Sequence, residues 1–175
     1  MDTYKVVPDV LAVAPSEILN VVYPDIEVNL GNEIKPRKVK DKPKVEWKSE
    51  PSSYYTLCMT DPDNAQPTDV LPEWHHWLVG NIPGNNVADG ETLAEYIGSG
   101  PPDGTGLHRY VFVLYKQPGR LTFDEKRLGF SVDGRASFKI GNFAQKYNLG
   151  NPVAANFYLA QFDDWVPQLY ELLGA

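Results

Sequence analysis

Three histidines stand beside aromatic residues in segments with the composition of β-strands, where an imidazole can bind an anion, transfer a proton or hold a metal. Two of them, His75 and His76, are adjacent. Because neighbouring strand residues point to opposite faces, only one of this pair can line a given pocket on a regular strand. The alternation predicts that Trp74 shares the face of His76 and that Trp77 shares the face of His75.

The third histidine, His108, shares its strand face with Tyr110, whereas Arg109 points the other way. Acidic residues and glycines stand at the ends of the same strands. Asp61-Pro62-Asp63 follows one candidate strand, and Gly98–Gly106 comes just before the strand of His108. Loops at strand ends collect functional groups, and glycines let a backbone expose successive N–H groups to an anion.

These residue types suit a phosphate that carries an ammonium group. Histidine and loop N–H groups would bind the phosphate, and Asp61 or Asp63 would bind the ammonium or orient a histidine. If the imidazole must be charged, affinity falls as the pH rises from about 6 to 8. Each feature also has a structural explanation: an Asx-type turn for the acids, core packing for a histidine and an ordinary turn for the glycines. Only their combination favours a binding site.

The chain lacks the motifs of common enzyme classes, including Walker A, a complete G-x-G-x-x-G, H-E-x-x-H and C-x-x-C. Gly129-Phe-Ser-Val-Asp133 resembles a nucleophile elbow but lacks its final glycine. A zinc ion has possible ligands in His76, His108 and Asp61, although their spacing does not require a metal. We therefore predict a binding protein without catalytic residues, metal or cofactor, and a metal-dependent hydrolase is an alternative.

The composition is that of an acidic, aromatic-rich globular chain. It has 175 residues, 42% of them hydrophobic, and this length allows one self-sufficient core, so we expect a single domain over 1–175. The net charge of −7 opposes binding to nucleic acid. A single cysteine, Cys58, with no apolar leader and no membrane-spanning stretch, predicts a cytoplasmic protein, and we expect a monomer.

Fifteen Pro and 14 Gly divide the chain into short segments, as in a mostly β domain. The predicted strands alternate in polarity or are rich in β-branched and aromatic residues, and they cover 25–30, 54–60, 73–79, 107–115 and 153–162. Helices are predicted over 137–148 and 164–173, and 8–20 forms a short helix or two turns. Six basic residues between Lys35 and Lys44 protect a sheet edge or bind an acidic partner.

Four segments together resemble one known family. They are Asp61-Pro62-Asp63, Glu73-Trp-His-His76, Tyr96-Ile-Gly-Ser-Gly-Pro-Pro102 and Gly104-Thr-Gly-Leu-His-Arg-Tyr110. Their order and approximate spacing are similar to those of the phosphatidylethanolamine-binding proteins. The segment 160–170 resembles the animal branch, which includes the Raf kinase inhibitor protein, and the likeness extends from about Glu17 onward.

The resemblance implies two antiparallel sheets with Greek-key connections, and peripheral helices that include a C-terminal helix. It also implies a small pocket for phosphorylethanolamine, phospholipid headgroups or small anions, and a protein kinase or serine protease as a partner. The predicted ligand-binding residues, from the motifs and the resemblance, are Asp61, Asp63, Trp74, His76, Gly98, Gly100, Pro101, His108, Tyr110 and Tyr170. The family pattern Asp-Pro-Asp-x-Pro is altered here, since the proline stands at Pro67. An interaction module with a vestigial pocket is a further hypothesis.

Overall fold

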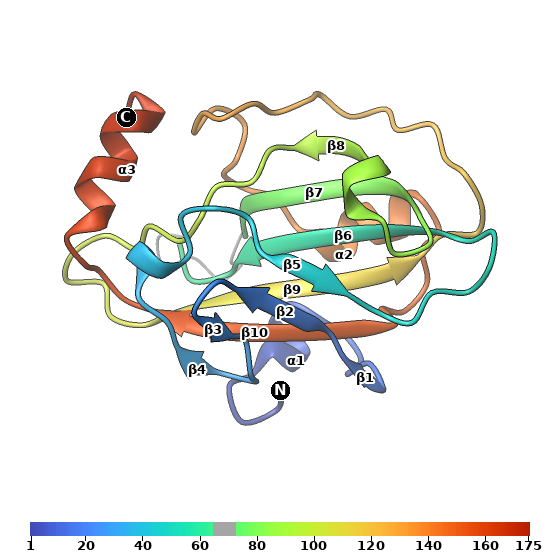
Figure 1. The fold of residues 1–175 in the computed structure, drawn as a ribbon, viewed down its shortest axis with the longest axis horizontal. Helices are drawn as coiled ribbons and strands as arrows, with labels where there is room; N and C mark the ends of the chain where they lie inside the picture. Colours follow the sequence, from blue (N-terminus) through green and yellow to red (C-terminus); the bar gives the residue numbers. More distant parts are fainter. Residues whose placement is uncertain (65–72) are drawn as a thin grey trace.

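The computed structural model describes residues 1–64 and 73–175 and consists mainly of β-strands (Figure 1). Its strands are β1 (Glu17–Ile18), β2 (Asn20–Tyr23), β3 (Ile26–Glu27), β4 (Asn32–Glu33), β5 (Lys44–Glu46), β6 (Tyr54–Asp61), β7 (Trp74–Pro83), β8 (Glu91–Ala94), β9 (His108–Lys116) and β10 (Ala154–Ala160). Its helices are α1 (Val6–Asp9), α2 (Ile140–Lys146) and α3 (Trp165–Leu173), with short 3-10 helices η1 (Pro36–Lys38) and η2 (Val87–Asp89). Pro67, where the chain departs from the family pattern, lies outside the described residues.

The strands form two sheets. The large sheet has the order β1-β10-β9-β6-β7-β8, with β4 also paired to β10, and the small sheet has the order β3-β2-β5. In Figure 1 the small sheet lies in front of the large one, α1 and α2 lie behind it, and α3 stands at one end. This arrangement confirms the predicted two-sheet β fold with peripheral helices. It corrects the antiparallel prediction only at β1 and β4, which both pair parallel to β10.

Apolar side chains fill both faces of the large sheet. Leu57 and Phe112 belong to the cluster on the face toward the small sheet. The next residues along each strand, Cys58 and Val113, belong to the cluster beneath α1 and α2. Consecutive buried residues of this kind are what a sheet covered on both faces requires. A third, smaller cluster around Leu169 attaches α3 to the ends of the strands.

Strand β7 departs from regular alternation at the histidine pair. Its pairing with β6 shifts in register between Met59, which pairs with Trp77, and Thr60, which pairs with His75. His76 is therefore the extra residue of a β-bulge. A bulge of this kind changes the direction in which the side chains around it point, and bulges are common beside binding sites.

The bulge places two neighbouring side chains on the same side of the sheet. His75 stacks on Phe138 at 3.7 Å, on the side of α2. His76 and Trp77 both lie on the side of the small sheet. The prediction that Trp74 accompanies His76 is confirmed by a separation of 4.5 Å between their rings. The prediction that Trp77 shares the face of His75 is wrong, because it assumed a regular strand.

The helices agree with their predicted positions but differ at their ends. Helix α3 ends before Gly174, as predicted, where a φ of 71° gives the left-handed conformation that glycine favours. Helix α2 begins at Ile140 and not near Ser137, whose φ of 63° is incompatible with a helix. The segment 8–20 contains only the end of α1, strand β1 and the start of β2, and the strand predicted over 25–30 is reduced to β3.

A buried carboxyl group takes the place of the missing helix cap. The Glu73 side chain is 3% exposed and accepts a hydrogen bond from the Ile140 amide at 3.1 Å, at the start of α2. The backbone of Glu73 exchanges two further hydrogen bonds with Phe138. Burial raises the pKa of Glu73 to about 7, although these polar contacts oppose the shift. Glu73 therefore binds a proton more tightly in the folded chain than in the unfolded chain.

We expect the substitution Glu73→Gln to stabilise the fold at pH 8 and to have little effect at pH 4.5. Between about pH 4.3 and 7 the unfolded chain loses the Glu73 proton while the folded chain keeps it, so stability falls as the pH rises. The expected gain at pH 8 is on the order of 1–3 kcal/mol. Urea unfolding of both proteins at the two pH values measures it. A variant that is less stable than the wild type at pH 8 would contradict this account of Glu73.

Candidate functional site

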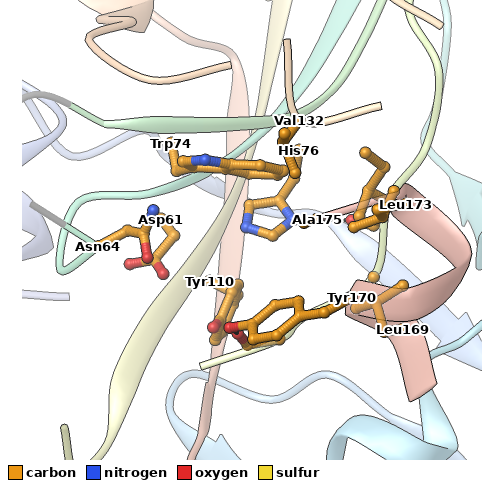
Figure 2. Close-up of a pocket in the computed structure, with 13 residues that line it drawn as sticks. Asp61, Asn64, Trp74, His76, Tyr110, Val132, Leu169, Tyr170, Leu173 and Ala175 are labelled. Carbon is orange, nitrogen blue, oxygen red and sulfur yellow. Dashed lines mark hydrogen bonds between the residues drawn. The ribbon is translucent and has the colours of Figure 1, made fainter. Parts of the chain in front are cut away.

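Side chains at the strand ends beside α3 enclose a cavity of about 170 Å³. Its lining brings together seven of the predicted residues: Asp61, Trp74, His76, Gly98, Gly100, Tyr110 and Tyr170. Figure 2 shows Trp74 lying along His76, with Asp61 and Tyr110 facing the same space and Tyr170 approaching from α3. Strands β6, β7 and β9, the loop after β8 and helix α3 all contribute to this lining.

Three predicted residues lie outside the cavity lining. Asp63 instead binds Arg109, whose Nε and Nη2 donate to its carboxylate at 2.9 and 2.8 Å. His108 lies behind Asp61, and Pro101 belongs to the loop beyond Gly100. Their roles in ligand binding stay predictions.

Six lining residues were not predicted from the sequence: Asn64, Ile97, Val132, Leu169, Leu173 and Ala175. The helical spacing of Leu169 and Leu173 does predict that they share a face, but not that this face closes a cavity. Val132 belongs to the segment that resembled a nucleophile elbow, and no local pattern places it here.

The imidazole of His76 is buried between aromatic rings and held in one orientation. Its Nδ1 lies 2.7 Å from the carbonyl oxygen of Ile97. A carbonyl oxygen can only accept a hydrogen bond, so Nδ1 carries the hydrogen. Burial lowers the pKa of His76 to about 3, and nearby Arg135 lowers it further although the Ile97 contact opposes the shift. His76 is therefore neutral at physiological pH, and its Nε2 has a free lone pair.

Asp61 and His108 form a buried pair behind the cavity. His108 Nδ1 lies 2.9 Å from Asp61 Oδ2, and both side chains are almost fully buried. The hydroxyl of Thr105 donates to Pro102 O at 2.7 Å, so it accepts from His108 Nε2, also at 2.7 Å. Burial opposes the charged imidazole, but the hydrogen bond and charge of Asp61 prevail and raise the pKa of His108. The pair therefore holds a proton between His108 Nδ1 and Asp61 Oδ2.

A fully buried arginine lies beside the histidines. Arg135 Nη1 donates to the carbonyl oxygens of His75 and His76 at 2.9 and 3.2 Å, and Nη2 donates to Gly129 O. Its guanidinium carbon lies 5.8 Å from the ring centre of Trp74, which lines the cavity. Burial lowers the pKa of Arg135 to about 10, which leaves it charged at neutral pH. Among the described residues it has no carboxylate within ion-pair distance.

Gly98 and Gly100 are needed because their backbone packs too closely against neighbouring residues to leave room for a side chain. A Cβ atom on Gly98 would lie 2.3 Å from the carbonyl oxygen of Val39, and one on Gly100 would lie 2.9 Å from Leu169. The hydroxyl of Tyr170 donates to Gly100 O, which joins α3 to this loop. Glycine therefore lets the loop pack between η1 and α3 while its backbone borders the cavity.

The alternative zinc site finds no support in this geometry. Within residues 1–64 and 73–175, no group of three His, Cys, Asp or Glu side chains is close enough to hold a metal ion. His76 and His108 also use their Nδ1 atoms in hydrogen bonds to Ile97 and Asp61.

In the same described residues, no helix is both long and apolar enough to cross a membrane.

Comparison with known proteins gives the same fold and a family. The Drosophila melanogaster protein named "Putative odorant-binding protein A5" is 36% identical over 176 residues, which cover 99% of this chain and 84% of that protein. The solution structure of CG7054 has a TM-score of 0.76 and 43% identity, and the match covers 96% of this chain and 97% of that one. The carboxypeptidase Y inhibitor, in complex with its cognate proteinase, has a TM-score of 0.75 and 28% identity, with 93% of each chain covered.

A family match covers most of the chain. Residues 25–158 match the family described as phosphatidylethanolamine-binding protein. This range includes the cavity-lining residues from Asp61 to Val132, whereas those from Leu169 onward lie outside it. The fold, the sequence relatives and this match agree that the chain belongs to the phosphatidylethanolamine-binding protein family.

Proposed function

We propose that this chain binds a small phosphate-like anion, free or as a phospholipid headgroup, in the cavity between β7 and α3. The observation that carries the proposal is the buried charge of Arg135 behind Trp74, which lines the cavity. A buried cation without a carboxylate partner is costly, and an anion in the cavity would offset part of that cost. The protein would act as a binding and regulatory protein and not as an enzyme.

The size of the cavity supports a small ligand. Pockets for drug-sized molecules usually measure roughly 300–1,000 Å³, whereas this cavity measures about 170 Å³. A phosphate with a short substituent is of the right order, while acyl chains would have to remain outside. Asp61, His76 and Tyr170 supply polar atoms that a headgroup could contact, while apolar side chains line the rest of the cavity.

The mouth of the cavity supports a lipid as one source of the headgroup. Val132 lines the cavity and is 38% exposed, and Phe130, two residues earlier, is 45% exposed. Leu172, on the neighbouring surface of α3, is 63% exposed. Exposed apolar residues beside a polar pocket are suited to contact the acyl chains of a lipid whose headgroup lies inside.

A regulatory role is the second part of the proposal. A family relative of the same fold is an inhibitor that binds its cognate proteinase. For this chain we propose a serine protease or a protein kinase as the partner of a cytoplasmic monomer. The basic residues from Lys35 to Lys44 offer one contact surface, since Lys42 and Lys44 are exposed beside β5.

Phosphorylethanolamine added to ¹⁵N-labelled protein should shift the amides of β7, β9 and the loop 98–106. The substitution His76→Ala should weaken binding by about tenfold or more, because it removes a hydrogen-bonding group in the cavity. Lys48→Gln, an exposed position outside the cavity lining, should leave affinity unchanged. Saturating ligand without these shifts would contradict the proposal.

The substitution Asp61→Asn should lower the pKa of His108, because it removes the negative charge that helps to raise it and leaves only a neutral hydrogen-bond acceptor. Asp63→Asn is the matched control: Asp63 hydrogen-bonds Arg109 and acts on His108 only through its charge, so the pKa of His108 should fall less than in the Asp61 variant. Histidine ¹H–¹⁵N correlation spectra recorded against pH measure the change. An unchanged titration of His108 in the Asp61 variant would show that the pair does not share its proton as described.

A panel of serine proteases and protein kinases tests the regulatory part. If the ligand site controls the partner, His76→Ala should change inhibition and a double charge reversal, Lys38→Glu with Lys40→Glu, should change it less. The opposite pattern, in which only the charge reversal abolishes inhibition, would indicate an interaction module with a vestigial pocket.

A further inference from the structure

Three side chains that face the cavity, those of His76, Asp61 and Tyr170, offer hydrogen-bond acceptors, while Trp74 and Tyr110 carry the donors of the lining. His76 presents Nε2 without a hydrogen, because its Nδ1 hydrogen is committed to Ile97 O at 2.7 Å. Among the described residues Nε2 has no hydrogen-bond partner, and Figure 2 shows the ring edge directed toward the space shared with Asp61 and Tyr110. This nitrogen can accept a hydrogen from a ligand but cannot donate one.

Two other cavity groups have the same character. The hydroxyl hydrogen of Tyr170 is directed at Gly100 O, so its oxygen can only accept from the cavity. Asp61 accepts from the Asp63 amide at 2.7 Å with Oδ1, and its Oδ2 shares a proton with His108. Any proton on Asp61 is therefore directed toward His108 and away from the ligand. A fully ionised anion would meet lone pairs at all three groups.

The surroundings of His76 keep it in this neutral form. Burial is the largest factor, and among residues 1–64 and 73–175 no carboxylate lies within ion-pair distance of the ring to favour its cation. The titratable groups packed around it are Asp61 on β6, His75 on β7, His108 and Tyr110 on β9, Arg135 before α2 and Tyr170 on α3. The positive charge of Arg135, and the protonated form of His108, oppose a positive charge on His76.

We propose that the cavity prefers a ligand whose phosphate still carries a hydrogen that it can donate. The bound species is then a tetrahedral monoanion with one O–H, such as a singly ionised phosphate monoester. The O–H donates to His76 Nε2. The remaining charge lies in the field of Arg135 and next to the backbone of Gly98 and Gly100. This inference rests on the proposed anion site and adds the protonation state that the site requires. It favours a phosphate monoester over the phosphodiester of phosphatidylethanolamine, whose phosphate has no O–H.

The chemistry of phosphate gives this selection a clear signature. A phosphate monoester loses its last proton near pH 6, so the required monoanion becomes scarce above that pH. Affinity for a monoester should therefore fall about thirtyfold between pH 5 and pH 7.5. A charged histidine would give a fall in the same direction, so pH dependence alone does not distinguish the two explanations.

A pair of ligands with the same shape and charge does distinguish them. At pH 5 methyl phosphate is a monoanion with one O–H, whereas methyl sulfate is a monoanion with none. Calorimetric titration should show methyl phosphate binding at least tenfold more tightly than methyl sulfate. Equal affinities would overturn the selection but leave the anion site standing. Failure of both ligands to bind would overturn the proposed function as well.

The variant His76→Gln supplies a matched test. Its amide can donate as well as accept, so the preference for methyl phosphate over methyl sulfate should fall below about threefold. Thermal unfolding at pH 5 checks that the variant is folded. A preference that persists in the folded variant would show that His76 does not accept the ligand's hydrogen.

The wild-type protein offers a readout that needs no variant. Histidine ¹H–¹⁵N correlation spectra should show His76 as the neutral tautomer with its hydrogen on Nδ1 from pH 5 to pH 8. The same form should persist when methyl phosphate is bound. An imidazolium signal for His76 within this range, free or bound, would overturn the proposal.

Discussion

The buried guanidinium of Arg135 is the interaction on which the architecture of the site depends. It donates to the backbone carbonyls of His75 and His76, within the bulge of β7, and to Gly129. A bulged strand has carbonyl groups that its neighbour in the sheet does not pair, and a guanidinium with five donors can satisfy several of them. The same contacts place a positive charge 5.8 Å from the ring centre of Trp74, which lines the cavity. Arg135 therefore both stabilises the bulge of β7 and supplies the positive charge near the cavity.

The second constraint is that the most obvious anion-binding side chain is not a cation. A surface histidine would titrate near pH 6.5 and attract phosphate by charge. In this chain burial and Arg135 keep His76 neutral, and Ile97 fixes its tautomer. The positive charge and the hydrogen-bond acceptor of the site are thus carried by different residues. The neutral His76 can therefore distinguish ligands by whether they carry a hydrogen, which attraction between opposite charges alone would not do.

Local patterns in the sequence predict much of the fold and part of the site. The β-branched and aromatic run of β9 and the cap of α3 at Gly174 are clear, and alternation pairs Trp74 with His76. The bulge that brings Trp77 to the same side depends on the register with β6, which no single strand encodes. The role of Arg135 is hidden for a similar reason, since it is one of 16 basic residues and its partners are backbone atoms. Protonation states follow from burial and so require the tertiary structure.

The central claim is that the cavity holds a phosphate and keeps one proton on it. ³¹P NMR of bound phosphorylethanolamine at pH 7.5 tests it most directly, because the phosphorus shift differs between the singly and doubly ionised forms. The account predicts a bound signal with the shift of the monoanion, while the free ligand in the same sample is largely the dianion. A bound signal with the shift of the dianion would contradict it.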